Sequence, residues 1–141
     1  MATKIERLEL TLDFILIGIS TQLPAYKVCF ELNQKLQLSL TKQVKPHPFF
    51  IPKRMLNADA DLYSYYDGAG INYRLIKNKA EQGLVVPELK QIDYLLCVHD
   101  MQGKTTAINI YTKLKTYKQF LGVFNCDVNT LKSKDNLYFD E

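Results

Sequence analysis

The chain has little of what metal sites and disulfide frameworks need. Tryptophan is absent, and 141 residues contain only two histidines and three cysteines, without a Cys-x-x-Cys or His-x-x-x-His spacing. Cys29, Cys97 and Cys126 each fall inside an apolar pattern, where a free thiol behaves as a small buried hydrophobe. The sequence therefore argues against a zinc site, and it favours a reduced cytoplasmic protein without disulfides.

Long apolar runs and a large excess of one charge are also missing. The longest apolar run near the N-terminus, from Phe14 to Ile19, is too short for a membrane helix or a signal-peptide core, so we expect no membrane partner. Eighteen basic and 15 acidic residues give a net charge of +3, which does not require a nucleic-acid partner. The length and the 47% apolar content fit one globular domain.

Apolar periodicity predicts a mixture of strands and two helices. The first helix opens at Pro24, and the second follows Gly103 and Lys104; each has an apolar stripe at spacings of three and four. A turn at Asp67–Gly70 between β-favouring runs predicts a hairpin. The expected strands are, in order, 8–20, 38–41, 63–66, 72–76, a further hairpin turning through 78–83, a central strand at 92–99, and a last strand at 121–128.

This order, β-α-β-β-β-β-α-β, predicts an α+β domain with a mixed sheet of the split β-α-β kind and both helices packed on it. We expect a single domain over residues 1–141, with 131–141 as a polar C-terminal tail. The segment Lys45–Pro48, with Pro52 soon after, lacks several amide donors and predicts an irregular connection.

Two blocks of sequence resemble a known family. The first is Val86-Pro87-Glu88-Leu89-Lys90-Gln91-Ile92-Asp93-Tyr94, and the second is Asp127-Val128-Asn129, Leu131-Lys132-Ser133-Lys134, Asn136-Leu137 and Phe139. Both are similar to the signature and the closing segment of the IPExxxVDY family of small bacterial proteins. Leu16–Ser20, Tyr26 and the Leu32-Asn33 pair also resemble that family's opening strand and helix. The departures are mild, because Val86 and Ile92 keep β-branched apolar side chains.

The resemblance implies no assigned activity, so the signature must be interpreted from its residues. Pro87 cannot donate to a sheet ladder and fits a strand start or the first turn of a short helix. Ile92 and Tyr94 should point to one face of the next strand and Asp93 to the other. A covered Asp93 needs a hydrogen-bond or ion-pair partner, so the signature favours a structural role over a binding role. Glu88 and Asp93 on one strand would face opposite sides, which disfavours a catalytic pair.

Two other features indicate alternative functions. Gly103-Lys104-Thr105-Thr106 lies where a phosphate-binding loop would sit, but Val98 occupies a glycine position of that motif, so a helix cap at Thr105 or Thr106 is favoured. Free anion binding or a small enzyme with a site near Gly103-Lys104 stays open. Lysines outside the core could contact RNA, with Tyr63, Tyr65 and Tyr66 stacking on bases. Genes of the resembled family tend to lie near those for ribonuclease III and fatty-acid synthesis, which adds weight to an RNA-accessory role as an alternative.

We therefore expect a non-enzymatic cytoplasmic binding or adaptor protein without a cofactor, acting on a protein partner or on another copy of itself. An accessory RNA-binding role that uses basic residues near the C-terminus is the alternative. The candidate partner-binding residues lie around the signature and in the closing segment: Pro87, Glu88, Asp93, Tyr94, Lys132, Lys134 and Asn136.

Overall fold

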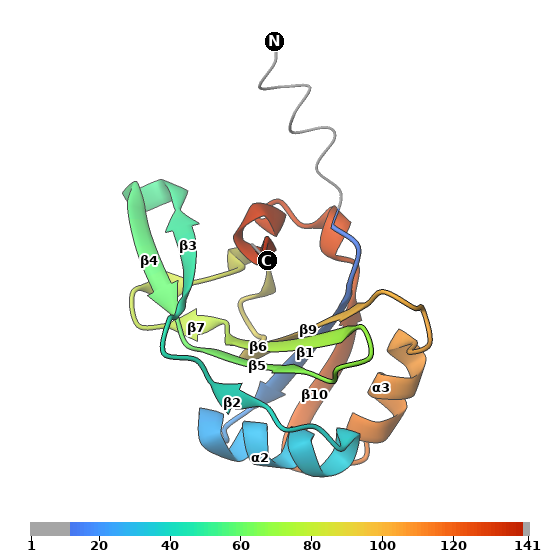
Figure 1. The fold of residues 1–141 in the computed structure, drawn as a ribbon. Coiled ribbons are helices and arrows are strands. Elements are labelled where there is room, and N and C mark those ends of the chain that lie inside the picture. Colours follow the sequence, from blue (N-terminus) through green and yellow to red (C-terminus); the bar gives the residue numbers. More distant parts are fainter. Residues whose placement is uncertain (1–11, 140–141) are drawn as a thin grey trace.

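A six-stranded antiparallel sheet forms the centre of the fold. The computed structural model describes residues 12–139, in which the strand order is β10–β1–β9–β6–β5–β2 (Figure 1). The strands of this sheet are β1 (Ile15–Thr21), β2 (Thr41–Lys42), β5 (Leu62–Tyr66), β6 (Ile71–Lys77), β9 (Tyr94–Asp100) and β10 (Phe120–Cys126). β1, β9 and β6 lie inside the sheet, whereas β10 and β2 form its two edges.

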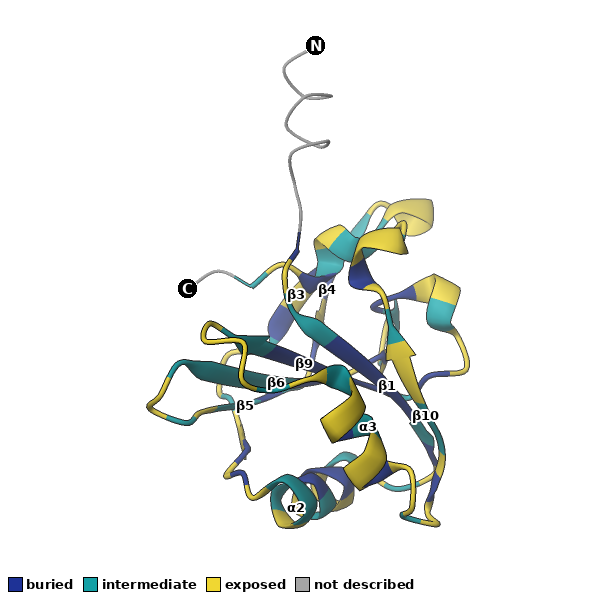
Figure 2. Ribbon diagram, turned by 90° about the vertical axis from the view of Figure 1, so that its right-hand side faces the viewer, coloured by how far each residue is buried: buried dark blue, intermediate teal, exposed yellow. Residues whose placement is uncertain are grey.

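Both helices pack on one face of the sheet, as their apolar stripes predict. They are α2 (Ala25–Leu36) and α3 (Ala107–Leu114). Their buried side chains meet alternate residues of the inner strands, such as Ile17 of β1 and Leu96 of β9, because successive side chains of a strand point to opposite faces. Figure 2 shows α2 and α3 with their exposed surfaces turned away from this core. No helix in the described part of the chain is long and apolar enough to span a bilayer.

The opposite face of the sheet is covered by short elements. They are a hairpin of β3 (His47–Ile51) and β4 (Leu56–Ala60), a small hairpin of β7 (Lys79–Ala80) and β8 (Gly83–Leu84), and 3-10 turns at Pro87–Leu89, Val128–Thr130 and Lys134–Leu137. Leu16, Ile76 and Leu95 of the sheet form a second core with side chains from this cover, including Val86 and Leu137. The signature segment and the closing segment therefore lie in the same layer.

The α+β class, the two packed helices and the split β-α-β order are confirmed. The strand order predicted a mixed sheet, but every described pairing between neighbouring strands of this sheet is antiparallel. Within each β-α-β unit the two strands run in the same direction but do not pair. β1 lies between β9 and β10, and three strands lie between β1 and β2.

The proline-rich segment is regular, contrary to the prediction of an irregular connection. Pro48 lies inside β3, opposite Asp59 of β4, and Pro52 starts the 3-10 turn that joins the two strands. A proline is excluded from the middle of a sheet because it lacks an amide hydrogen. Each strand of a two-stranded hairpin has one unpaired side, so Pro48 can be accommodated there.

The C-terminal segment is not a free polar tail over its described part. Leu137 is fully buried in the second core, and the 3-10 turn Lys134–Leu137 packs against β3. The polar composition of residues 131–139 did not indicate this docking, which depends on the side chains of Leu137 and Asn136. Residues 140–141, like residues 1–11 with the predicted start of the first strand, lie outside the described residues.

Candidate functional site

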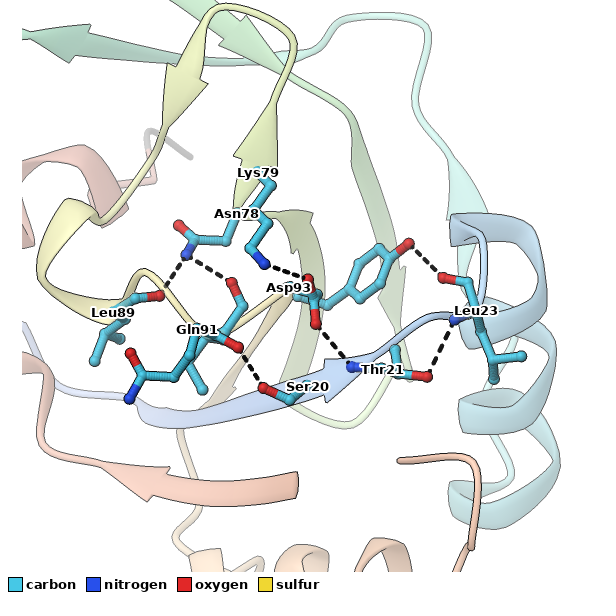
Figure 3. A network of polar contacts seen from close by, with 10 residues as sticks. Ser20, Thr21, Leu23, Asn78, Lys79, Leu89, Gln91 and Asp93 are labelled. Atoms are coloured by element: carbon cyan, nitrogen blue, oxygen red, sulfur yellow. Dashed lines mark hydrogen bonds and ion pairs between the residues drawn. The ribbon is translucent and has the colours of Figure 1, made fainter. Parts of the chain in front are cut away.

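The signature segment Val86–Tyr94 is organised around a buried side chain that precedes it, that of Asn78. The side-chain nitrogen Nδ2 of Asn78 donates to the carbonyl oxygens of Leu89 at 3.0 Å and Ile92 at 2.9 Å (Figure 3). Its Oδ1 accepts from the amide of Val86 at 2.8 Å. One side chain therefore fixes the backbone of the signature near its beginning, middle and end.

The backbone of Asn78 is used as fully as its side chain. Its N–H donates to the carbonyl of Asp93 and its own carbonyl accepts from the amide of Val85, both at 2.9 Å. Asn78 therefore has a partner for each of its donors and for both of its acceptors. Sequence reasoning placed Asn78 only in a hairpin turn, because a buried asparagine that binds backbone at a distance has no local pattern.

Asp93 joins three parts of the chain. Its carboxylate accepts from the amide of Thr21, at the end of β1, at 2.8 Å, and it pairs with the Lys79 ammonium of β7 at 2.9 Å (Figure 3). Its backbone amide donates to the carbonyl of Ile19 at 2.9 Å. Asp93 therefore has the structural partners that its position in the signature requires.

Tyr94 is buried in the core beneath the helices, and its hydroxyl donates to the carbonyl of Leu23 at 2.9 Å. Burial raises the pKa of Tyr94 to about 12, and the charges of Asp93 and Tyr63 act in the same direction. The hydroxyl therefore stays protonated as a donor over the physiological pH range. It anchors the loop that leads into α2.

Ile92 lies directly on the glycine of β1. A Cβ added at Gly18 would come within 2.9 Å of Ile92 Cδ1, closer than side chains pack. Beside it, the hydroxyl of Ser20 donates to the carbonyl of Gln91 (Figure 3). The signature therefore rests on the Leu16–Ser20 stretch that also carries the resemblance, and a larger residue at Gly18 would push it away.

Glu88 connects the signature to the closing segment. Its two carboxylate oxygens accept from the amide of Ser133 at 2.8 Å and from the Ser133 hydroxyl at 2.9 Å. Partial burial raises the pKa of Glu88, but amide hydrogen bonds from Glu88 itself, Ser133 and Lys132, with that hydroxyl, outweigh it. The pKa of Glu88 is therefore below its ordinary value. This carboxylate, though exposed, is held in its charged form by the closing segment.

Asn136 performs a similar function for the hairpin. Its side-chain amide donates to the carbonyls of Phe50 at 3.1 Å and Val85 at 2.9 Å, and its Oδ1 accepts from the Phe50 amide at 3.0 Å. The Asn136 carbonyl contacts Nε2 of the buried His47. Asn136 therefore ties the closing segment to β3 and to Val85, the residue that precedes the signature.

The structure brings the two resembling blocks together, but most of the predicted surface residues are used inside the fold. Tyr94 is buried, while the side chains of Glu88, Asp93 and Asn136 bind other segments. Pro87 and Lys132 are exposed and Lys134 is half-buried. Glu88 and Asp93 take different partners, Ser133 for Glu88 and Thr21 with Lys79 for Asp93.

The Gly103–Lys104 loop holds a carboxylate of its own. Asp100 accepts from the amides of Gln102 at 2.9 Å and of Thr105. Some desolvation raises the pKa of Asp100, but these donors outweigh it and hold that pKa below its ordinary value. The Thr106 hydroxyl caps α3 by accepting from the Asn109 amide, as expected of a capping residue. Two of the loop amides, those of Gln102 and Thr105, are thus already engaged by Asp100.

The tyrosines do not form an open stacking platform. Tyr63 is buried under the helices, and Tyr65 stacks against Tyr73 with ring centroids 6.1 Å apart. Tyr66 alone of the three is exposed. They are mainly cross-strand partners, as expected for aromatic residues in a hairpin.

A basic groove of about 560 Å³ lies between β3, β5, β6 and the closing segment. Lys45, His47 and Arg74 line it together with Ser64 and the Phe139 ring, on which the Arg74 guanidinium lies at 4.6 Å. Burial lowers the pKa of His47, and the Arg74 charge adds to that effect, although the Asn136 carbonyl and Asp59 oppose it. His47 is therefore neutral at physiological pH.

The outer edge of β10 has the least protection in the sheet. None of its seven residues, Phe120–Cys126, is charged or a proline, and no described strand pairs with it beyond β1 (Figures 1 and 2). Leu121 is 70% exposed and Phe124 is 45% exposed. Natural edge strands are usually short, charged or covered, so an exposed apolar edge of this length indicates a surface for pairing.

Reactive groups are sparse among residues 12–139. No three His, Cys, Asp or Glu side chains there are placed to hold a metal ion. Burial raises the pKa of Cys97, which is enclosed in the second core, and burial also raises the pKa of Cys29. Both thiols are therefore poor nucleophiles at neutral pH.

Comparison with models of known protein families, with curated proteins and with solved structures finds no match for the chain. Membership of the IPExxxVDY family therefore stays a prediction.

Proposed function

We propose that this chain is a non-enzymatic binding protein that takes up a strand of a protein partner along the free edge of β10. The single observation that carries the proposal is the uncharged seven-residue edge with exposed Leu121 and Phe124. In strand addition the main chain supplies affinity and alternate side chains supply specificity. The outer main chain of β10 has no strand partner among the described residues, and its exposed side chains include Leu121 and Phe124.

The opposite edge of the sheet supports this choice by contrast. β2 has only two residues, Thr41 and Lys42, and the Lys42 ammonium lies 3.8 Å from the Asp61 carboxylate. Short length and charge are the usual means of preventing edge pairing. β10 has neither, so the two edges differ in their capacity to accept a partner.

The contacts of the signature support the same proposal from another side. Asn78, Asp93 and Tyr94 direct their polar atoms to other parts of this chain, so they stabilise the fold that presents β10. We also propose that the chain belongs to the IPExxxVDY family, on the sequence resemblance of Val86–Tyr94 and of the closing segment. The free cysteines support the proposed cytoplasmic location.

The experiment is affinity capture of protein partners from ribonuclease-treated lysate of the native cells, with Leu121→Lys and Phe124→Lys as variant baits. Both substitutions add charge to the edge and should abolish capture of the partner. Met101→Lys is the matched control, because Met101 is 86% exposed and lies in the loop after β9. Equal capture by all four baits would refute binding at β10.

A second candidate, an accessory RNA-binding role, is favoured by the basic groove. Its lysine, arginine and aromatic side chains are the types that bind phosphates and unstacked bases. The candidate predicts that a labelled oligoribonucleotide binds in a salt-dependent manner and that Lys45→Glu weakens binding more than Lys132→Glu and Lys134→Glu do. Larger effects of Lys132→Glu and Lys134→Glu than of Lys45→Glu would place the contact near the C-terminus instead, and no binding at low salt would exclude this role.

A further inference from the structure

We infer that the strand accepted by β10 is β10 of a second copy of this chain, paired antiparallel about a two-fold axis at Val123. This inference rests on the proposed function, because it names the partner of the same edge. The result would be one continuous sheet of twelve strands across two copies. An interface of this kind is self-complementary, because each copy contributes the same surface.

The side chains of β10 fit each other in this register. When Val123 lies on the axis, Gly122 of each copy stands opposite Phe124 of the other, since residue numbers of paired positions then sum to a constant. Gly122 and Phe124 lie on the same face of the strand, which is the face opposite the helices. A Cβ at Gly122 would meet the Phe124 ring of its own chain at 2.7 Å, so that ring already lies over the glycine.

This pairing therefore sets the exposed Phe124 ring beside the half-buried Gly122 twice. Aromatic side chains opposite a glycine at a sheet edge are known to cover the glycine backbone and to stabilise the pairing. Phe124 is 45% exposed, so its ring has apolar surface left to bury against the second copy. Leu121, which lies at the bulge where β10 shifts register against β1, would stand opposite the neutral Asn125.

The charges at the two ends of β10 are opposite. Lys118 is exposed just before the strand, and Asp127 is exposed directly after it. Asp13 lies in the same shallow depression as Asp127 and adds to the acidic end. An antiparallel pairing centred on Val123 sets Gln119 opposite Asp127 of the second copy, with Lys118 next to it. Each copy therefore places its basic end on the acidic end of the other.

This charge complementarity distinguishes a second copy from an arbitrary partner strand. A parallel pairing of two copies would set Lys118 beside Lys118 and Asp127 beside Asp127, which is repulsive. The contact buries mainly one strand and its side chains. We therefore expect a transient, concentration-dependent dimer, as for interfaces below about 1,200 Å².

The test is sedimentation velocity of the full chain over a wide concentration range, with two charge-reversed variants, Lys118→Glu and Asp127→Lys. The wild-type chain should shift from monomer to dimer as its concentration rises. Each variant alone juxtaposes like charges and should raise the dissociation constant about tenfold or more. An equimolar mixture of the two variants should dimerise again, because both end contacts then join opposite charges.

Recovery of the dimer in the mixture cannot come from a change in the stability of either variant, because each variant alone dimerises poorly. Asp127 also caps the turn at Val128–Thr130 by accepting from the Asn129 amide, so Asp127→Asn, which keeps this acceptor, provides a neutral control. Melting curves should show that all variants are folded.

A wild-type chain that stays monomeric at every concentration would overturn the inference. A dimer that both single variants retain would overturn it too. Neither result removes the proposed function, because capture of another protein that is lost with Leu121→Lys would still place a partner strand on β10. Loss of both the dimer and that capture would refute the two together.

Discussion

The signature and the edge strand β10 use their bonding groups in opposite ways. In the signature region, the side chains of Asn78, Asp93 and Tyr94 bind backbone groups of the same chain, across separations of 8 to 72 residues in sequence, and Asp93 also pairs with Lys79. In β10, the outer side of the strand has no strand partner among residues 12–139, and Leu121 and Phe124 are exposed. A recognisable motif therefore need not mark the surface that binds, and here it marks the part that holds the fold.

The largest change in the free energy of unfolding is expected at Asn78. Asn78→Asp replaces an amide that donates to Leu89 and Ile92 with an oxygen that repels both carbonyls, and it buries a charge. We expect a loss of about 4 kcal/mol in the free energy of unfolding at neutral pH, measured by urea denaturation. The new carboxyl would have a raised pKa in the folded state, so the deficit should shrink as the pH falls toward about 4.

A loss below about 1 kcal/mol for Asn78→Asp at neutral pH would contradict the structural role of this side chain. Asn57→Asp is the matched control, because Asn57 is exposed on β4. The same change should be close to neutral there.

The next effect is expected where the signature rests on β1. Gly18→Ala places a Cβ within 2.9 Å of Ile92 Cδ1 and should cost about 2 kcal/mol. Ile92→Val removes that methyl group and should cost about 1 kcal/mol alone. The double variant should be more stable than the sum of the two losses predicts, in a double-mutant cycle by thermal or urea unfolding. Additive losses would mean that the two residues do not press on each other.

Removal of the Asp93 carboxylate should have a similar or smaller effect. Asp93→Ala leaves the buried amide of Thr21 without its acceptor and should cost about 2 kcal/mol. Asp93→Asn keeps an acceptor for Thr21 but loses the ion pair with Lys79, so we expect about half of that loss. If Asp93→Asn destabilised as much as Asp93→Ala, the ion pair rather than the amide contact would be the main contribution.

A smaller, pH-dependent effect is expected at Glu88. Its pKa in the folded protein lies below the ordinary value, so its contribution is present above about pH 4.5 and is lost as the pH falls through the folded pKa. Glu88→Gln should therefore be less stable than the wild type at neutral pH, by under about 1 kcal/mol because the pair is exposed. The difference should disappear in acid.

Parallel measurements on Glu81→Gln provide the control, since Glu81 is exposed in the turn between β7 and β8. Glu81→Gln should match the wild type throughout. A Glu88→Gln difference that stays constant from pH 7 to about pH 3 would show that its charge is not what binds Ser133.

The smallest change in the free energy of unfolding is expected on β10, where a substitution should affect binding rather than folding. Leu121 is 70% exposed, so Leu121→Lys should alter the free energy of unfolding of the monomer by no more than about 0.5 kcal/mol. The same substitution should weaken the dimer. A strongly destabilised Leu121→Lys monomer would mean that the edge belongs to the core, and it would remove the contrast between the two regions.

Local patterns in the sequence predict the helices, the Asp67–Gly70 hairpin and the central strand, because apolar periodicity and turn residues act over short distances. Such patterns also predict that Asp93 needs a partner. They do not reveal Asn78, whose partners depend on how separate segments pack. The β3–β4 hairpin was missed because its prolines disfavour strands in general, and the docking of Leu137 was missed because its neighbours are polar.

The most direct test of the central claim is hydrogen exchange of the full chain, followed residue by residue at low and at high protein concentration. We expect the Val86 and Thr21 amides, bound by Asn78 and Asp93, to be protected equally at both concentrations. The β10 amides not bonded to β1 should become protected only at high concentration. Protection of those β10 amides that does not depend on concentration, or rapid exchange at Val86 and Thr21, would contradict the contrast between the two regions.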